Sequence, residues 1–162
     1  EQINVTPIRK VHFIVGKFIP SWIMGQIILT IGLTIARFAY GIIPIGNIGL
    51  IYLFSSVYLL VVLGLGLLVS TFVQTQQQAM LISFFLMMIF ILMGGLYTSI
   101  DSMPAWAQMI TRFNPVSYFI DVMRMVVLKG SRLKDILPHL GIMSIFAVVL
   151  NSWAVLSYKK RN

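Results

Sequence analysis

Few side chains in this sequence have types and spacings suited to chemistry. The 162 residues include no cysteine, two histidines and four acids, so cysteine nucleophiles, disulfides and thiolate metal sites are excluded. His12 and His139 are far apart, and neither has a second potential ligand at metal-binding spacing. Gly16-Lys17 matches the end of a phosphate-binding loop, but position 11 is Val where that pattern requires Gly. We therefore expect no catalytic residue and no metal site in this chain.

The elements that must position any functional residue are membrane spans. From Phe38 to Ile100 the chain runs 63 residues without Asp, Glu, Lys, Arg or His. A helix of that length measures about 95 Å, about three times the hydrocarbon thickness of a bilayer. Hydrophobic residues make up 59% of the chain and charged residues 10%, and the mean hydropathy is +0.94. Such values are typical of membrane proteins with several spans.

The net charge of +8 does not indicate nucleic-acid binding. Lys and Arg lie at the two ends of the chain and in one segment between apolar blocks. Basic residues beside membrane spans commonly face lipid headgroups. We therefore expect membrane lipids as partners and no nucleic acid.

Charge-free windows and local breaks predict an all-α integral membrane fold with four transmembrane helices. Gly and Pro residues at 41–49 and the polar run at 74–78 divide the long apolar stretch. The predicted spans cover about 18–39, 50–72, 79–97 and 136–158. An even number of spans places both termini on one side of the membrane. Basic residues are equally numerous on the two sides but denser beside the termini, which favours cytoplasmic termini.

Polar side chains inside the predicted spans have two possible roles. Gln26, Ser83 and Asn151 could line a path across the membrane or form hydrogen bonds between helices. Acids are absent from 38–100 and from 136–158. Because proton- or sodium-driven carriers usually bury acids in their spans, this pattern argues against an ion-driven carrier.

The segment at 101–135 is predicted to form two short helices, re-entrant or interfacial, on one side of the membrane. One face of the first helix is apolar and carries Trp106, Met109, Ile110 and Phe113. Asn114-Pro115 is predicted to end this helix, because proline disfavours helical geometry in the residue before it. The second helix, at about 116–128, is too short to cross a bilayer. Asp121 and Arg124 stand at i, i+3 on it and could form an ion pair, either below the headgroups or at the surface.

The first 17 residues are polar and basic. Ile3, Val5 and Ile8 give this segment an exposed apolar character, so it could lie on headgroups as a linker or dock a soluble partner. Because this beginning is unlike a natural amino terminus, we expect the chain to be the carboxy-terminal part of a longer protein.

Four segments in order resemble one known family. They are E-Q-I-N-V-T-P-I-R-K at 1–10 with I-V-G-K-F-I-P at 14–20, V-S-T-F-V-Q-T-Q-Q-Q-A-M at 69–80, G-G-L-Y-T-S-I-D-S-M-P-A-W-A-Q at 94–108, and F-N-P-V-S-Y-F-I-D-V-M-R at 113–124. Together they resemble the ABC-2 type permeases, the membrane subunits of bacterial ABC exporters. The resemblance covers nearly the whole chain. It implies that the four spans are the last four of a six-span bundle whose amino-terminal part is missing here.

The resemblance also implies roles for particular segments. Residues 1–17 would be the cytoplasmic coupling-helix loop, and 101–135 the external re-entrant helix pair. The residues expected to contact the ATPase are Glu1, Gln2, Ile3, Val5, Thr6, Pro7, Ile8 and Arg9. Those expected at the external gate are Asn114, Pro115, Asp121 and Arg124. Residues 159–162 would be a cytoplasmic tail.

The resemblance further implies the partners and the location. An ABC ATPase subunit would bind ATP and Mg, so this chain would need no cofactor and would not be an enzyme. A second permease subunit would complete a homo- or heterodimer in the cytoplasmic (inner) membrane. The expected function is ATP-driven export of a drug-like amphiphile, an antibiotic, a lipid or a polysaccharide. Alternative functions are an ion-coupled secondary transporter or channel, and a membrane anchor or scaffold that transports nothing.

Overall fold

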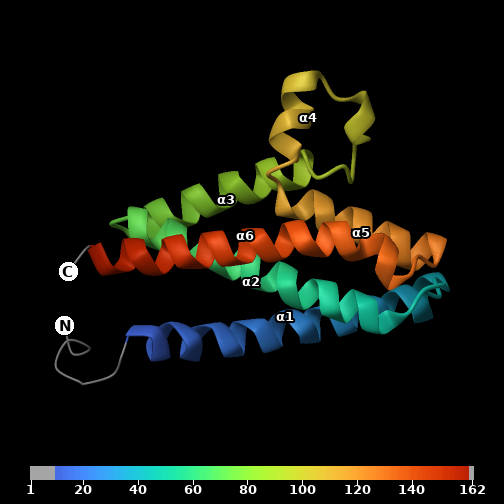
Figure 1. Cartoon of the computed structure of the whole chain (residues 1–162), viewed down its shortest axis with the longest axis horizontal. Helices are drawn as coiled ribbons and strands as arrows, with labels where there is room; N and C mark the ends of the chain where they lie inside the picture. Colours follow the sequence, from blue (N-terminus) through green and yellow to red (C-terminus); the bar gives the residue numbers. More distant parts are fainter. Residues whose placement is uncertain (1–9, 161–162) are drawn as a thin grey trace.

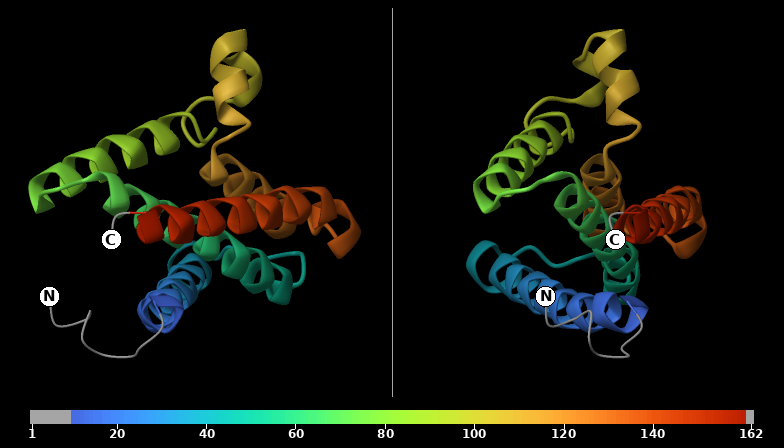
Figure 2. Two further views of the ribbon diagram at one scale, coloured as in Figure 1. Left: turned by 60° about the vertical axis from the view of Figure 1, so that its left-hand side comes forward. Right: turned by 90° about the vertical axis from the view of Figure 1, so that its left-hand side faces the viewer.

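The computed structural model describes the backbone of residues 10–160 and the side chains of residues 15–157, and its regular elements are all helices. In chain order these are α1 (Lys10–Tyr40), α2 (Ile48–Phe72), α3 (Gln76–Leu92), the short 3-10 helix η2 (Ile100–Ser102), α4 (Ala105–Thr111), α5 (Pro115–Lys129) and α6 (Leu133–Lys160). The long helices α1, α2 and α6 run along the length of the molecule, and η2 and α4 stand away from the bundle (Figure 1). α2 is central, because it contacts α1, α3, α5 and α6 (Figure 2).

Among the described residues, three helices are long and apolar enough to cross a membrane. The qualifying segments are Val15–Tyr40, Ile48–Phe72 and Leu133–Ser157. Each has 25 or 26 residues, which gives a length of about 37 Å, more than the roughly 30 Å of hydrocarbon in a bilayer. The start of α1 and the end of α6 lie at the same end of the bundle (Figure 1).

Helix α3 is shorter than the span predicted at 79–97. It has 17 residues, which amounts to about 25 Å. The Thr75 hydroxyl caps its start by accepting a hydrogen bond from Gln78 N, so the glutamines at 76–78 form its first turn rather than a break. Gly95, with φ of +79°, then turns the chain away beyond the other end. A fourth span therefore stays a prediction.

The ends of the other helices follow from their capping residues. α1 already begins at Lys10 and continues through Pro20 without ending. Asn114 caps the start of α5, and Gly130, with φ of +64°, ends it. Near the start of α6, the Arg132 backbone N–H donates to Asp135 Oδ2 at 2.8 Å, so this helix begins at Leu133 rather than at 136.

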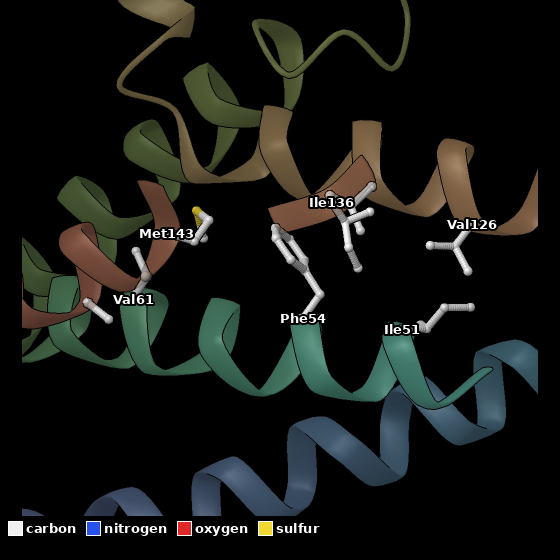
Figure 3. Close-up of a cluster of buried hydrophobic side chains, with 8 residues drawn as sticks. Ile51, Phe54, Val61, Val126, Ile136 and Met143 are labelled. Atoms are coloured by element: carbon white, nitrogen blue, oxygen red, sulfur yellow. The ribbon is translucent and has the colours of Figure 1, made fainter. Parts of the chain in front are cut away.

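The core lies where α2, α5 and α6 meet. Its buried apolar side chains come from all three helices and are Ile51, Phe54, Val61, Val122, Val126, Ile136, Met143 and Ala147 (Figure 3). Lipid tails are as apolar as these side chains, so the hydrophobic effect contributes little to packing between helices inside a bilayer. Close van der Waals fit and hydrogen bonds between helices must hold the core together.

The contact between α2 and α6 shows both forces. Asn151 Nδ2 on α6 donates across to Leu60 O on α2 at 3.1 Å, and to Ala147 O on its own helix at 2.7 Å. Gly64 on α2 makes room for this amide, because a Cβ at position 64 would lie 2.9 Å from the Asn151 amide atoms. The glycine therefore permits the hydrogen bond that joins the two helices.

Gly64→Leu should separate α2 from α6, because the added side chain collides with Asn151. We expect a loss of about 1–3 kcal/mol in unfolding free energy, the usual cost of overpacking. The measurement is denaturant unfolding of the full-length protein in detergent. Gly66→Leu is the matched control, since a Cβ at position 66 meets nothing within 4 Å. Equal stability of the two variants would contradict this account of the core.

Candidate functional site

The residues expected to couple this chain to an ATPase lie outside the described part of the structure. They are Glu1, Gln2, Ile3, Val5, Thr6, Pro7, Ile8 and Arg9. The structure describes the backbone from Lys10 onward, and α1 begins at this residue. The coupling assignment therefore stays a prediction.

Two of the four residues expected at the external gate, Asn114 and Arg124, reach the end of α3. We call this region the α3–α5 junction and define it by three carbonyl acceptors, Phe90, Met93 and Gly95, and three side-chain donors, Thr111, Asn114 and Arg124. α5 begins beside the end of α3, about midway along α6 (Figure 1). Both helices are thus short, and their ends meet within the bundle.

Donors at the junction are needed because the last carbonyls of a helix have no partner within it. The Gly94 N–H bonds to Ile91 O, which leaves Phe90 O without its usual helical donor. Asn114 Nδ2 fills this role at 2.8 Å, and its side chain is only 2% exposed. Thr111 Oγ1, on the last residue of α4, lies 3.2 Å from Met93 O. The end of α3 is therefore capped by side chains from the α4–α5 region.

Asn114 also starts the next helix. Its Oδ1 accepts the Val116 N–H at 2.9 Å, and Pro115 occupies the first turn of α5. Ser117 and Tyr118 fix the same turn by donating to Thr111 O at 3.1 Å and to Arg112 O at 2.9 Å. One buried amide thus connects α3 to α5 and holds α5 in register.

Asp121 and Arg124 do not form the ion pair that their spacing suggests. Arg124 Nη2 donates instead to Gly95 O at 2.8 Å, beyond the end of α3. Burial raises the pKa of the Asp121 carboxyl, and the charges of His139 and Arg124 oppose this effect. The difference arises because the guanidinium reaches a carbonyl on another element, a contact that spacing along one helix does not reveal.

His139 is packed against α5. Its ring meets the Tyr118 ring edge-on, with centroids 5.9 Å apart, and its Nδ1 is buried without a hydrogen-bond partner. No three His, Asp or Glu side chains come together to hold a metal ion within the described residues. The His139 ring therefore packs against the Tyr118 ring of α5.

Two of the three polar residues singled out in the spans join helices. Gln26 Nε2 donates to Ser56 Oγ at 3.0 Å, and its Oε1 accepts from Ser55 Oγ at 3.2 Å, which connects α1 to α2. Asn151 connects α2 to α6. Ser83 instead lines a groove of about 420 Å³ between α2 and α3, with Met87 and Phe90 among the other wall residues. Of the three, Ser83 is the one left facing a cavity.

Sequence reasoning missed Thr111 and Gly95 at the junction. A signal was present for Gly95, because the pair Gly94-Gly95 directly follows an apolar helix. For Thr111, only the fold shows that its hydroxyl lies near Met93 O. Asn114 and Arg124 were singled out beforehand, and the structure brings both to the end of α3. Asp121 lies on the same helix and senses the charge of His139 on α6.

Comparison with known proteins places this arrangement in a family. Residues 1–156 match the family described as ABC-2 family transporter protein. The chain is 31% identical over 161 residues to the probable multidrug ABC transporter permease YbhR of Escherichia coli (strain K12), covering 99% of this chain and 44% of that protein. It is 30% identical over 134 residues to the probable multidrug ABC transporter permease YbhS of the same strain, covering 81% and 35%. The linearmycin resistance permease protein LnrN of Bacillus subtilis (strain 168) is 27% identical over 137 residues, covering 85% and 34%.

The chain spans less than half the length of these relatives. No solved structure matches it. The family match nonetheless covers almost every residue, and it agrees with the helices that the structure describes over residues 10–160, three of which are suited to crossing a membrane. This integral membrane chain belongs to the ABC-2 family of transporter proteins.

Proposed function

We propose that this chain is the carboxy-terminal part of the membrane-spanning subunit of an ATP-driven ABC-2 exporter. The observation that carries the proposal is the family match over residues 1–156. The sequence lacks a complete phosphate-binding loop, with Val at position 11 in place of Gly. ATP and Mg would therefore bind to a separate ATPase subunit, and this chain would need no cofactor and catalyse no reaction.

The subunit would work in the cytoplasmic membrane with both termini in the cytoplasm. Two permease subunits, identical or different, would pair there and each would receive one ATPase. α3 would be the fourth span of this chain, completed on the outer side by α5. The four spans would be the last four of a six-span bundle surrounded by lipid.

Force from the ATPase would enter at Glu1–Arg9, the expected coupling segment. α1 follows this segment directly and is one helix of 31 residues. Its contacts with α2 include the Gln26–Ser56 hydrogen bond and a 2.7 Å contact between the Thr30 and Tyr52 hydroxyls. A push on the segment would therefore move α1 as a rigid rod and tilt α2 with it.

The α3–α5 junction would belong to the external gate. Asn114, Pro115, Asp121 and Arg124 lie on α5 or its cap, and two of them hold the end of α3. Hydrogen bonds from side chains to carbonyls can be exchanged at modest cost, so α5 could shift relative to α3 during transport. The exposed apolar side chains of α4, including Trp106 and Met109, would face lipid.

The transported molecule would be an apolar or amphiphilic compound. The groove between α2 and α3 has almost entirely apolar walls, including Leu65, Val69 and Met87. The names of the relatives refer to multidrug transport and linearmycin resistance. Drug-like amphiphiles and antibiotics are therefore the substrate classes that we favour. Lipids and polysaccharides are the other classes, and substrate-stimulated ATPase activity would test all four.

Replacing both Ile3 and Ile8 with Asp in the full-length protein should abolish ATPase binding and transport. The apolar side chains that would dock on the ATPase are lost, whereas the membrane spans are unchanged. Pull-down of the ATPase subunit and flux into membrane vesicles measure the two effects. The double substitution to Leu is the control and should retain both activities. Undiminished ATPase association with the Asp variant would remove this coupling site.

Asn114→Ala should destabilise the protein by about 1–3 kcal/mol, because a helix cap and a buried hydrogen bond to Phe90 are lost together. Asn47→Ala is the matched control, since Asn47 caps α2 by accepting from Gly49 N and is exposed. Thermal unfolding in detergent measures stability, and vesicle flux measures transport. The gate assignment predicts a loss of transport per folded molecule for Asn114→Ala alone. Normal transport by this variant would overturn that assignment.

A further inference from the structure

A cavity of about 340 Å³ lies between α1 and α2 at the end of the bundle where α1 begins and α2 ends. Its walls include Lys17, Phe18 and Ser21 from α1. Leu63, Gly66 and Leu67 are among the α2 residues opposite. The cavity therefore combines one cationic side chain with a mainly apolar wall.

The cation distinguishes this cavity from its neighbours. The α2–α3 groove of about 420 Å³ and a groove of about 400 Å³ that includes Gly32, Ala36 and Met123 have no charged residue in their walls. The two hydroxyls at the charged cavity are already used as donors, because Ser21 Oγ donates to Lys17 O at 3.1 Å and Ser70 Oγ donates to Leu67 O at 2.6 Å. The Lys17 ammonium is thus the donor left for a ligand.

Lys17 has no acidic partner in the part of the chain that the structure describes. Its ammonium forms neither a hydrogen bond nor an ion pair with any described residue. The sequence contains no Asp or Glu from Gln2 to Ile100. The described acids are Asp101, Asp121 and Asp135, which belong to η2, α5 and α6 rather than to α1 or α2. Any counter-ion for Lys17 would therefore come from outside these helices.

The surroundings of the cavity favour an anion that is attached to an apolar chain. α1 begins at Lys10 and α6 ends at Lys160 at this same end of the bundle (Figure 1). Basic residues at the end of membrane helices attract anionic headgroups, and basic pockets between helices bind them. A phosphate at Lys17 would leave its acyl chain to extend along Phe18, Leu63 and Leu67, on the apolar side of the cavity.

We propose that this cavity is a binding site for an anionic phospholipid, with the headgroup phosphate on Lys17 and one acyl chain between α1 and α2. The proposal requires that α1 and α2 cross the bilayer, but it does not depend on which molecule is transported. A bound lipid would contact both helices on the amino-terminal side of Trp22 and Gln26, whose side chains already bond to Ser56 on α2. It would thereby brace α1 against α2 at the end nearest the expected coupling segment.

Photo-crosslinking of the full-length protein in phosphatidylcholine nanodiscs tests the site. One set contains a small fraction of phosphatidylglycerol with a photoactivatable acyl chain, and the other contains phosphatidylcholine with the same chain. Mass spectrometry then maps the labelled peptides. We expect phosphatidylglycerol to label peptides around Phe18 and Leu63–Leu67 several times more than phosphatidylcholine does.

Two variants with matched controls separate the headgroup from the acyl chain. Lys17→Gln should lower the phosphatidylglycerol label about fivefold, the effect of roughly one basic residue at an anionic surface. Arg37→Gln removes the same charge near the opposite end of α1 and should leave the label unchanged. Gly66→Leu should lower labelling by both lipids because it fills the cavity, whereas Gly141→Leu on α6 should not, since a Cβ there also meets open space.

The proposal is overturned by equal labelling with the two lipids, by an absence of label on the α1 and α2 peptides, or by an undiminished label in Lys17→Gln. Equal labelling would mean a nonselective lipid contact. An absence of label would mean that other parts of the full-length protein occupy the cavity. Because the readout is labelling of folded protein, monitored by size-exclusion chromatography, failure of transport or of ATPase coupling would leave the result interpretable.

Discussion

Inside a bilayer every polar group of the chain must find its partner within the protein, since the hydrocarbon offers none. Continuous helices such as α2 meet this requirement through their own backbone. A helix that ends within the bundle cannot, because its last carbonyls lack donors. α3 ends in this way, and the side chains of Asn114, Thr111 and Arg124 supply hydrogen bonds to carbonyls at or just beyond its end. The position of the α4–α5 region therefore follows from a demand for hydrogen bonds.

The same constraint shapes the contacts between the long helices. Because lipid competes equally for apolar side chains, association depends on close approach and on polar contacts. Gly64 leaves space for the Asn151 side chain, and Gly25 leaves space for the Leu59 side chain. A Cβ added at position 25 would lie 2.6 Å from the Leu59 side chain. Gln26 forms hydrogen bonds with Ser55 and Ser56, and none of these three side chains is charged. Large apolar side chains such as Ile28 and Phe38 remain exposed on the outside of the bundle.

Charge is distributed unevenly over this scaffold. The described acids lie in η2, α5 and α6, and burial raises the pKa of the one on α5, Asp121. α1 carries basic residues but no acid, and α2 carries no charged residue at all. In the proposed exporter this division would separate two tasks. The basic end would face anionic lipid and the ATPase, and the region around α5 would control the outer exit.

The sequence by itself indicated the membrane environment of the chain, its helical secondary structure and its family. A charge-free run of 63 residues indicated several membrane-spanning helices, and motifs such as F-N-P-V-S-Y at 113–118 pointed to the ABC-2 family that the comparison confirms. Asn114-Pro115 also marked the start of α5 correctly, because capping and proline geometry are local properties. The end of α3 was placed too late, and Gln74–Gln78 was taken wholly as a break, because Thr75 supplies a cap that turns three of these residues into helix.

Only the tertiary structure decided which polar groups meet. Arg124 had an acid three residues away, yet it binds Gly95 O on another element. Gln26 and Asn151 could have lined a path, but both join helices instead. The physical reason is that helical spacing restricts neighbours along one helix, whereas a partner on another helix depends on packing, and packing is a property of the assembled chain.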